Sequence, residues 1–205
     1  MSVFYKVSYR VRFHPWEDLP EHQPFADTLT ALFAREEQGR QPPFGTALDL
    51  GCGSATWGVR LAARGWQVTG VDDVPAAVAR AEQRIRRTAV DMRVVLGDVT
   101  RLRESAVGSG YRLVLDTGTF HGLTTAQRRD MGREVTSVAA DEATVILDCF
   151  APRRRGPLPH GCTQADVEEA FPGWRITDAV AADLEPDPIA RVFRFDEVFY
   201  RLRRR

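Results

Sequence analysis

The feature of this chain that most restricts its fold is a buried strand that runs directly into a glycine turn. Residues 46–50 are mostly apolar but include Asp49, and Gly51, Cys52 and Gly53 follow before helical periodicity begins. Two glycines at such a turn let a ligand approach the backbone with no Cβ in the way. The pattern predicts a strand–turn–helix unit that binds a ligand, although a tight structural turn would give the same residues.

Strand and helix patterns alternate along the rest of the chain, which is typical of an α/β fold with a mostly parallel sheet. A late helix followed by two strands predicts an antiparallel hairpin at one sheet edge. The predicted strands are 46–50, 66–71, 92–96, 111–115, 143–150, 174–180 and 191–202. The predicted helices are 24–38, 55–64, a helix that starts at Pro75, a helix that starts after Thr124, and 163–171. Thr124 and Gln127 have the spacing of a capping box at the start of the fourth helix.

Composition restricts the partners that we expect. The 205 residues suffice for one domain, and the formal net charge of zero provides no basic field for nucleic acid. Cys52, Cys149 and Cys162 show neither a disulfide framework nor a metal-binding spacing. No stretch approaches the roughly 20 apolar residues of a membrane span, and residues 1–12 lack the apolar block of a signal peptide. We expect a cytoplasmic protein.

Acidic residues stand at the predicted ends of the first two strands. Asp49 lies just before the glycine turn, where a carboxylate disfavours a pyrophosphate and suits a ligand that carries an ammonium and a sulfonium. Asp72 ends the second strand 21 residues beyond Gly51, a spacing at which a carboxylate accepts both hydroxyls of a ribose. Asp73 either joins this site or caps the helix that starts near Pro75.

Two further acids follow the next two strands. Asp98, with Val99 after it, comes directly after the third strand and is placed either to accept from an adenine amino group or to form a turn. Asp116 ends the fourth strand, beside the first strand, where the strand order should reverse and ligands bind. The dinucleotide fingerprint requires a third glycine where this chain has Thr56, which disfavours a nicotinamide-dependent oxidoreductase.

The chain resembles the class I S-adenosylmethionine-dependent methyltransferases in four motifs and in their order. These motifs are Leu48–Gly53, Gly70–Asp72, Gly97–Val99 and the strand that ends at Asp116. The resemblance implies a Rossmann-like, doubly wound, mostly parallel seven-stranded sheet with a C-terminal antiparallel hairpin. It implies one domain over 1–205, with a lid or helical segment at 1–40, a cofactor-binding core at 45–150, and an acceptor loop and final strands at 151–205. The small-molecule branch, which includes thiopurine, tellurite-resistance and fatty-acid types, is similar in length.

The resemblance also implies the roles of individual residues. S-adenosylmethionine would be the cofactor, and Ala55, where the family often has a third glycine, should do little harm because alanine is small. The predicted cofactor-binding residues are Trp16, Asp49, Gly51, Cys52, Gly53, Asp72, Asp73, Asp98, Val99 and Asp116. Trp16 belongs to an aromatic N-terminal stretch that either forms a lid over the site or covers the helices of the sheet.

His121 is the candidate catalytic residue, because it follows the fourth strand on the acceptor edge and an ordinary histidine pKa suits proton removal at neutral pH. A loop histidine that satisfies backbone groups is the alternative. Orientation alone supplies much of the acceleration of methyl transfer, so a base is optional. Arg153, Arg154 and Arg155 either meet an anionic acceptor or form a solvated loop.

We therefore predict a methyltransferase that acts on a small, hydrophobic molecule, with O-methylation ahead of S- or N-methylation. A non-catalytic module that binds the cofactor is the second hypothesis. Asp116 is followed by Thr-Gly-Thr-Phe rather than by the Pro-Pro-aromatic run of enzymes that methylate nucleobase amines, which argues against a nucleic-acid substrate. The four histidines share no metal-ligand spacing, so we predict no metal site.

Overall fold

The computed structural model describes residues 23–152, 161–181 and 197–205. A single seven-stranded sheet organises them, with the strand order β3-β2-β1-β4-β5-β7-β6. Strands β1 to β5 are parallel to one another, whereas β7 is antiparallel to both β5 and β6. The strand order reverses between β1 and β4, which is where a doubly wound sheet binds its ligands. The predicted fold class and the C-terminal antiparallel hairpin are confirmed.

The element bounds agree closely with the predicted ranges. The strands are β1 Gly45–Leu50, β2 Trp66–Asp72, β3 Met92–Leu96, β4 Tyr111–Thr117, β5 Ala139–Phe150, β6 Trp174–Ala181 and β7 Glu197–Arg204. The helices are α2 Gln23–Glu37, α3 Thr56–Ala63, α4 Pro75–Thr88, α5 Thr125–Val138 and α6 Gln164–Ala170, with short 3₁₀ turns η2 Leu102–Glu104 and η3 Phe120–Gly122.

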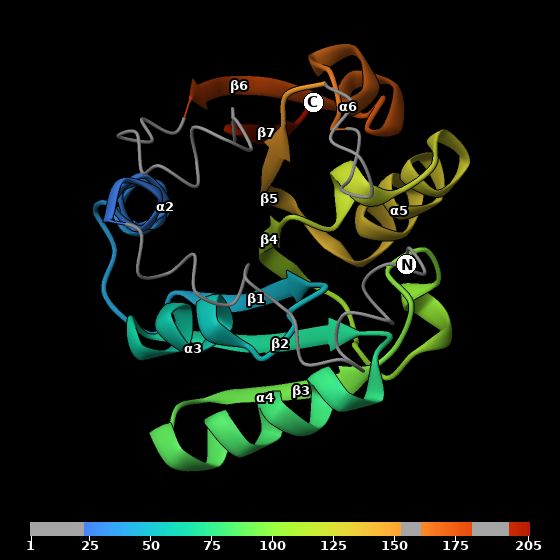
Figure 1. The fold of residues 1–205 in the computed structure, drawn as a ribbon. Coiled ribbons are helices and arrows are strands. Elements are labelled where there is room, and N and C mark those ends of the chain that lie inside the picture. The colour runs from blue at the N-terminus through green and yellow to red at the C-terminus, as the bar shows by residue number, and fades with distance from the viewer. Residues whose placement is uncertain (1–22, 153–160, 182–196) are drawn as a thin grey trace.

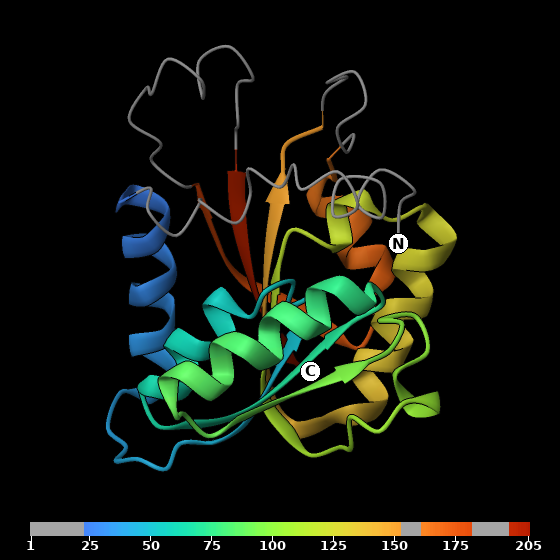
Figure 2. The ribbon, with the colours of Figure 1, turned by 60° about the horizontal axis from the view of Figure 1, so that its bottom comes forward.

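Helices cover both faces of the sheet (Figures 1 and 2). On one face, α2 and α3 bury Phe25, Leu29 and Leu61 in a cluster with Leu115 of β4 and Ile146 of β5. These three helical side chains are at most 1% exposed, so this face of the sheet is closed to solvent where they lie.

The other face of the sheet is covered by α5 and α6. Met131 and Val135 of α5 and Val167 of α6 are fully buried in a second cluster. They share this cluster with Val114 of β4 and with apolar side chains of β1 and β5. The central strands are therefore covered from both sides, as their nearly continuous apolar runs require.

Two helices, α5 and α6, begin with a capping box, in which side-chain hydrogen bonds satisfy backbone N–H groups of the first turn. The Thr124 hydroxyl accepts from the Gln127 N–H, while the Gln127 side chain accepts from the Thr124 N–H, so the predicted capping box of α5 is confirmed. Thr163 and Asp166 form the same reciprocal pair at the start of α6. These caps fix where the two helices leave the carboxyl edge of the sheet.

Three details differ from the sequence-based prediction. Strand β5 begins at Ala139, four residues earlier than predicted, because it continues past a pairing irregularity to meet Tyr111. Strand β7 continues to Arg204, and residues 191–196 of its predicted range lie outside the described residues. The N-cap of α4 is Val74, so Asp73 does not occupy the capping position that was its alternative role. Within the described ranges, no helix is long and apolar enough to cross a membrane.

Candidate cofactor and acceptor site

The carboxyl edge of the sheet brings together the acids that the sequence placed at separate strand ends. Asp49 pairs in register with Gly70 on β2 and with Leu115 on β4, and Leu50 pairs with Asp116. The negative charges of Asp116 and Asp72 both act on Asp49. Three strands therefore bring three carboxylates to one region at the point where the strand order reverses.

The glycine turn after β1 has a left-handed backbone. Gly51 and Gly53 have φ of 59° and 54°, and Ala55 has φ of 62°. A Cβ on Gly51 would also lie 1.9 Å from Thr119 Oγ1, so a side chain there would have to displace that of Thr119. The left-handed conformation of Ala55 explains why a glycine suits that position, and the sequence-based argument from the small size of alanine missed this backbone cost.

Asp49 is a buried carboxylate directly beneath this turn. It is 1% exposed, and its Oδ1 has no hydrogen-bond partner among the described residues. Burial, and then the charge of Asp116, raise the pKa of Asp49 to about 8. The backbone of Gly58 in α3 acts in the opposite direction and lowers the pKa of Asp49. A cation at this position would offset both causes of the raised pKa.

Asp72 holds the glycine turn from the end of β2. Its Oδ2 accepts from the Gly53 N–H at 3.0 Å, and its Oδ1 accepts from the Val74 N–H at 2.9 Å. Burial raises the pKa of Asp72 to about 6, against the effect of these two hydrogen bonds. Asp73 follows directly, at the edge of the same turn, and is partly exposed.

Two more contacts anchor the turn to the rest of the fold. The Cys52 N–H donates to the Val71 carbonyl at 3.0 Å, and a Cβ on Gly70 would lie 2.8 Å from Cys52 Sγ, so the thiol packs against bare backbone of β2. From α4, Arg84 Nε donates to the Ser54 carbonyl at 2.8 Å. Arg84 is a site residue that the sequence analysis did not identify.

Asp98 and Val99 lie beyond β3. Asp98 Oδ1 accepts from both the backbone N–H and the hydroxyl of Thr100, at 2.8 and 2.7 Å. Asp98 therefore forms the turn that was its alternative role. Val99 is 6% exposed and packs in the core cluster with Val71 and Leu102.

Asp116 organises the loop after β4. Its Oδ1 accepts from the N–H groups of Gly118 and Thr119 at 2.9 and 2.6 Å, and its Oδ2 accepts from the Phe120 N–H at 2.8 Å. Burial raises the pKa of Asp116 to about 7 in spite of these three bonds. The Thr119 hydroxyl then donates to the Leu50 carbonyl at 3.3 Å, which joins this loop to the glycine turn.

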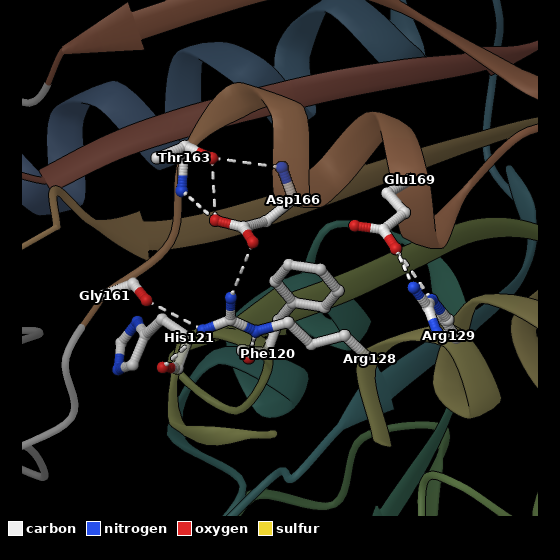
Figure 3. Close-up of polar contacts among 8 residues, drawn as sticks. All are labelled: Phe120, His121, Arg128, Arg129, Gly161, Thr163, Asp166 and Glu169. Atoms are coloured by element: carbon white, nitrogen blue, oxygen red, sulfur yellow. Dashed lines mark hydrogen bonds and ion pairs between the residues drawn. The ribbon is translucent and has the colours of Figure 1, made fainter. Parts of the chain in front are cut away.

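His121 lies in the same loop, buried against the end of β5. Its Nδ1 accepts from the Phe150 N–H at 3.3 Å, and its ring stacks on the Phe150 ring with centroids 4.1 Å apart. Figure 3 shows Arg128 next to it: Nη2 donates to the carbonyls of His121 and Gly161, at 3.1 and 2.7 Å, and Nη1 pairs with Asp166. Arg128 thus holds the histidine loop against the start of α6.

The structure brings most of the predicted site residues to this edge, but not all of them can be placed. Trp16, the segment that was expected to form a lid, and Arg153, Arg154 and Arg155 lie outside the described residues. Sequence reasoning missed Arg84, Thr119 and Arg128, whose roles depend on contacts between distant segments. Asp148 was also missed, although a carboxylate inside the apolar run of a central strand was visible in the sequence.

Solved structures with the same architecture define the class of this fold. The N-methyltransferase NodS of Bradyrhizobium japonicum, solved with S-adenosyl-L-homocysteine, superposes with a TM-score of 0.74 at 16% identity, over 93% of this chain and 91% of that one. This chain has the fold of the class I S-adenosylmethionine-dependent methyltransferases.

Sequence comparison also finds similarity to methyltransferases, mainly in the central segment. Residues 47–142 match the family model described as a methyltransferase domain. A 2-heptyl-1-hydroxyquinolin-4(1H)-one methyltransferase of Mycobacteroides abscessus is 25% identical over 72% of this chain, and the ribosomal RNA small subunit methyltransferase C of Alcanivorax borkumensis is 30% identical over 50%. The chain spans 66% and 29% of the lengths of these two relatives.

Proposed function

We propose that this protein is a methyltransferase that binds S-adenosylmethionine at the carboxyl edge of the sheet and methylates a small, hydrophobic molecule. The observation that carries the proposal is the buried Asp49 carboxylate, whose Oδ1 lacks a partner among the described residues directly beneath a left-handed glycine turn. The methyltransferase domain match and the fold support it.

The residues around the turn fit such a cofactor. A buried carboxylate with an unsatisfied oxygen, beside two other acids, attracts the ammonium and the sulfonium of S-adenosylmethionine. Gly51 and Gly53 offer backbone without a Cβ, and Asp72 stands at the strand end where a ribose is held. Asp73, Asp98, Val99, Cys52 and Asp116 border this region, and Trp16 is proposed from sequence alone to cover it.

The cofactor supplies an activated methyl group, and the protein supplies placement and electrostatics. We propose a hydrophobic acceptor because Phe150 ends β5 at this edge and stacks on His121, and O-methylation remains our first choice. The relative from Mycobacteroides abscessus is named for a small heterocyclic substrate, which supports a small-molecule acceptor.

His121 is proposed to act on the acceptor, but its hydrogen bond changes the role that we expect. Because Nδ1 accepts a hydrogen bond from the Phe150 N–H, the neutral ring carries its proton on Nε2. Nε2 can then donate a hydrogen bond to the acceptor, but it cannot remove a proton from it as a base. We expect His121→Ala to lower kcat at least tenfold while the affinity for the cofactor stays unchanged. Equal turnover would remove His121 from the site.

Calorimetry tests the proposal as a whole. We expect S-adenosylmethionine and S-adenosylhomocysteine to bind, and NAD, titrated in parallel, to give no heat. Failure of both adenosyl compounds to bind at millimolar concentration would refute the proposed function. Incubation of a small-molecule extract with an isotopically labelled methyl donor, followed by mass spectrometry, then identifies the methylated product and separates an enzyme from a non-catalytic binding module.

A further inference from the structure

The sheet face that carries Asp49 holds a second buried carboxylate that the proposed cofactor site does not use. Asp49 pairs with Leu115 of β4, and Leu115 pairs with Ile146 of β5. Asp148 lies two residues beyond Ile146, so its side chain points to the same face as that of Asp49. Asp148 is only 2% exposed.

The surroundings of Asp148 are unfavourable for a carboxylate. Its Oδ1 has no hydrogen-bond partner in the part of the chain that the structure describes. Phe199 of β7 is directly opposite in the ladder, and Phe150 is the next residue of β5 on this face. Glu197 pairs with Phe150 and is therefore a diagonal neighbour of Asp148.

No described cation compensates for this burial. Burial raises the pKa of Asp148 well above its ordinary value, and the charges of Glu197, Asp116 and Cys162 raise it further. A buried polar group that remains unsatisfied costs free energy, and such groups occur mainly where function requires them. The missing partner of Asp148 is therefore expected to be a ligand.

The register places Asp148 next to the proposed cofactor site but outside it. Two strand spacings, about 9–10 Å, separate β1 from β5 across the sheet, and Asp148 is about 6–7 Å further toward the carboxyl edge than Asp49. Aromatic side chains are neighbours of Asp148, since Phe199 is its partner in the ladder and Phe25 of α2 packs on Phe199 with ring centroids 5.0 Å apart.

We propose that Asp148, with Glu197 beside it, recognises the methyl acceptor, and that this acceptor is a flat apolar molecule whose hydroxyl group donates to Asp148. The inference rests on the proposed methyltransferase function and names the substrate class. Aromatic neighbours suit the apolar ring, and the ionised form of Asp148 only accepts hydrogen bonds, so it requires a donor on the ligand.

The proton of the acceptor then has a defined destination. As the hydroxyl oxygen bonds to the methyl carbon, the bond between carbon and sulfur breaks and its electron pair stays on sulfur. The hydroxyl proton passes to the Asp148 carboxylate. A sulfonium, a carboxylate and an alcohol thus become a thioether, a carboxylic acid and a methyl ether, with the charges balanced.

Binding measurements test the inference without requiring turnover. The protein saturated with S-adenosylhomocysteine is titrated with 4-ethylphenol, with its methyl ether 4-ethylanisole, and with 4-ethylbenzylamine. Wild type is compared with Asp148→Asn and Glu197→Gln. Asp91→Asn is the matched control, because Asp91 is exposed just before β3, outside the proposed site.

We expect wild type and Asp91→Asn to bind the phenol at least tenfold more tightly than the ether, and Asp148→Asn to reduce this preference to about threefold or less. Binding of S-adenosylhomocysteine should be unchanged in all variants. A preference that survives in Asp148→Asn, no preference in wild type, or tighter binding of the amine than of the phenol would overturn the inference. Failure of wild type to bind S-adenosylhomocysteine would instead refute the proposed function. If Asp148→Asn does not fold, the same comparison in Glu197→Gln decides, with a weaker preference expected.

Discussion

Two groups of buried charges share one face of the sheet and are built in opposite ways. Glu36 of α2 and Arg201 of β7 have side chains 7% and 9% exposed, and they pair at 2.6 Å while the Thr144 hydroxyl donates to Glu36 at 2.7 Å. Asp49 and Asp148, nearer the carboxyl edge, are as deeply buried, yet each has an oxygen without a partner among the described residues. We call the first group the paired cluster and the second the open acids.

The difference separates charges that hold the fold together from charges that await a ligand. In the paired cluster Glu36 and Arg201 are each other's nearest charged partner, so removal of one leaves the other buried with only longer ion pairs, at 3.8 and 3.9 Å. The open acids have no described cation to lose, so their neutralisation should leave the fold intact and impair the site. Substitution in the paired cluster should therefore lower stability, whereas substitution of an open acid should lower ligand binding.

The largest effect on stability is expected in the paired cluster. Glu36→Ala leaves the buried Arg201 guanidinium with only the Thr177 hydroxyl and the Asp178 carboxylate, the latter at 3.8 Å, and we expect the free energy of unfolding to fall by about 3 kcal/mol. Urea denaturation measures this. The control is Glu82→Ala, which removes an exposed partner of Arg86 and should cost less than about 1 kcal/mol. Similar losses in the two variants would contradict the comparison.

Substitution of an open acid should act on binding instead. Asp49→Asn removes the charge that faces the cationic cofactor, and loss of a charged hydrogen bond of about 1.5–3 kcal/mol corresponds to a Kd for S-adenosylmethionine about 10–150 times higher. The free energy of unfolding at pH 7 should not decrease, because a buried acid with a raised pKa is removed. A variant that loses stability but keeps its affinity would show that Asp49 is structural.

The sequence was sufficient for the fold because the determinants of the fold are local. Apolar runs, the two capping threonines and the glycine turn each lie within a few residues, and they set element bounds that the structure reproduces closely. The acids at the strand ends could also be placed, since parallel strands bring their carboxyl ends to one edge.

The contacts that distinguish the two groups of charges could not be predicted in this way. Glu36 and Arg201 are 165 residues apart, and nothing in either local sequence shows that they meet. The bond from the Phe150 N–H to His121 likewise joins separate segments and changes the chemistry expected of the histidine. Asp148 was overlooked because its apolar neighbours indicate only a buried strand, and the ladder register is needed to place it with Asp49.

The acids of the carboxyl edge also predict a pH dependence. The folded-state pKa values of Asp49, Asp116 and Asp72, about 8, 7 and 6, lie above those of an unfolded chain, so folding takes up protons between about pH 4 and 8. Their contribution therefore lowers the free energy of unfolding as the pH rises through this window. Asp49→Asn should reduce the slope, by at most about 1.4 kcal/mol per pH unit for one proton. Urea titrations at pH 5, 6, 7 and 8 measure it, and an unchanged slope would contradict the raised pKa.

The smallest effects on stability and on binding are expected at Arg84, which contributes both to the fold and to the cofactor site. Its guanidinium donates to the Ser54 carbonyl and hydroxyl, at 2.8 and 3.3 Å, and so holds the glycine turn from α4 without reaching a buried acid. Arg84→Ala should cost about 1 kcal/mol of stability and raise the Kd for S-adenosylhomocysteine about threefold to tenfold, because the turn becomes less ordered before binding. Arg87→Ala, at an exposed position later on α4, is the control. An affinity unchanged in Arg84→Ala would mean that Asp72 and the backbone bonds of Cys52 order the turn by themselves.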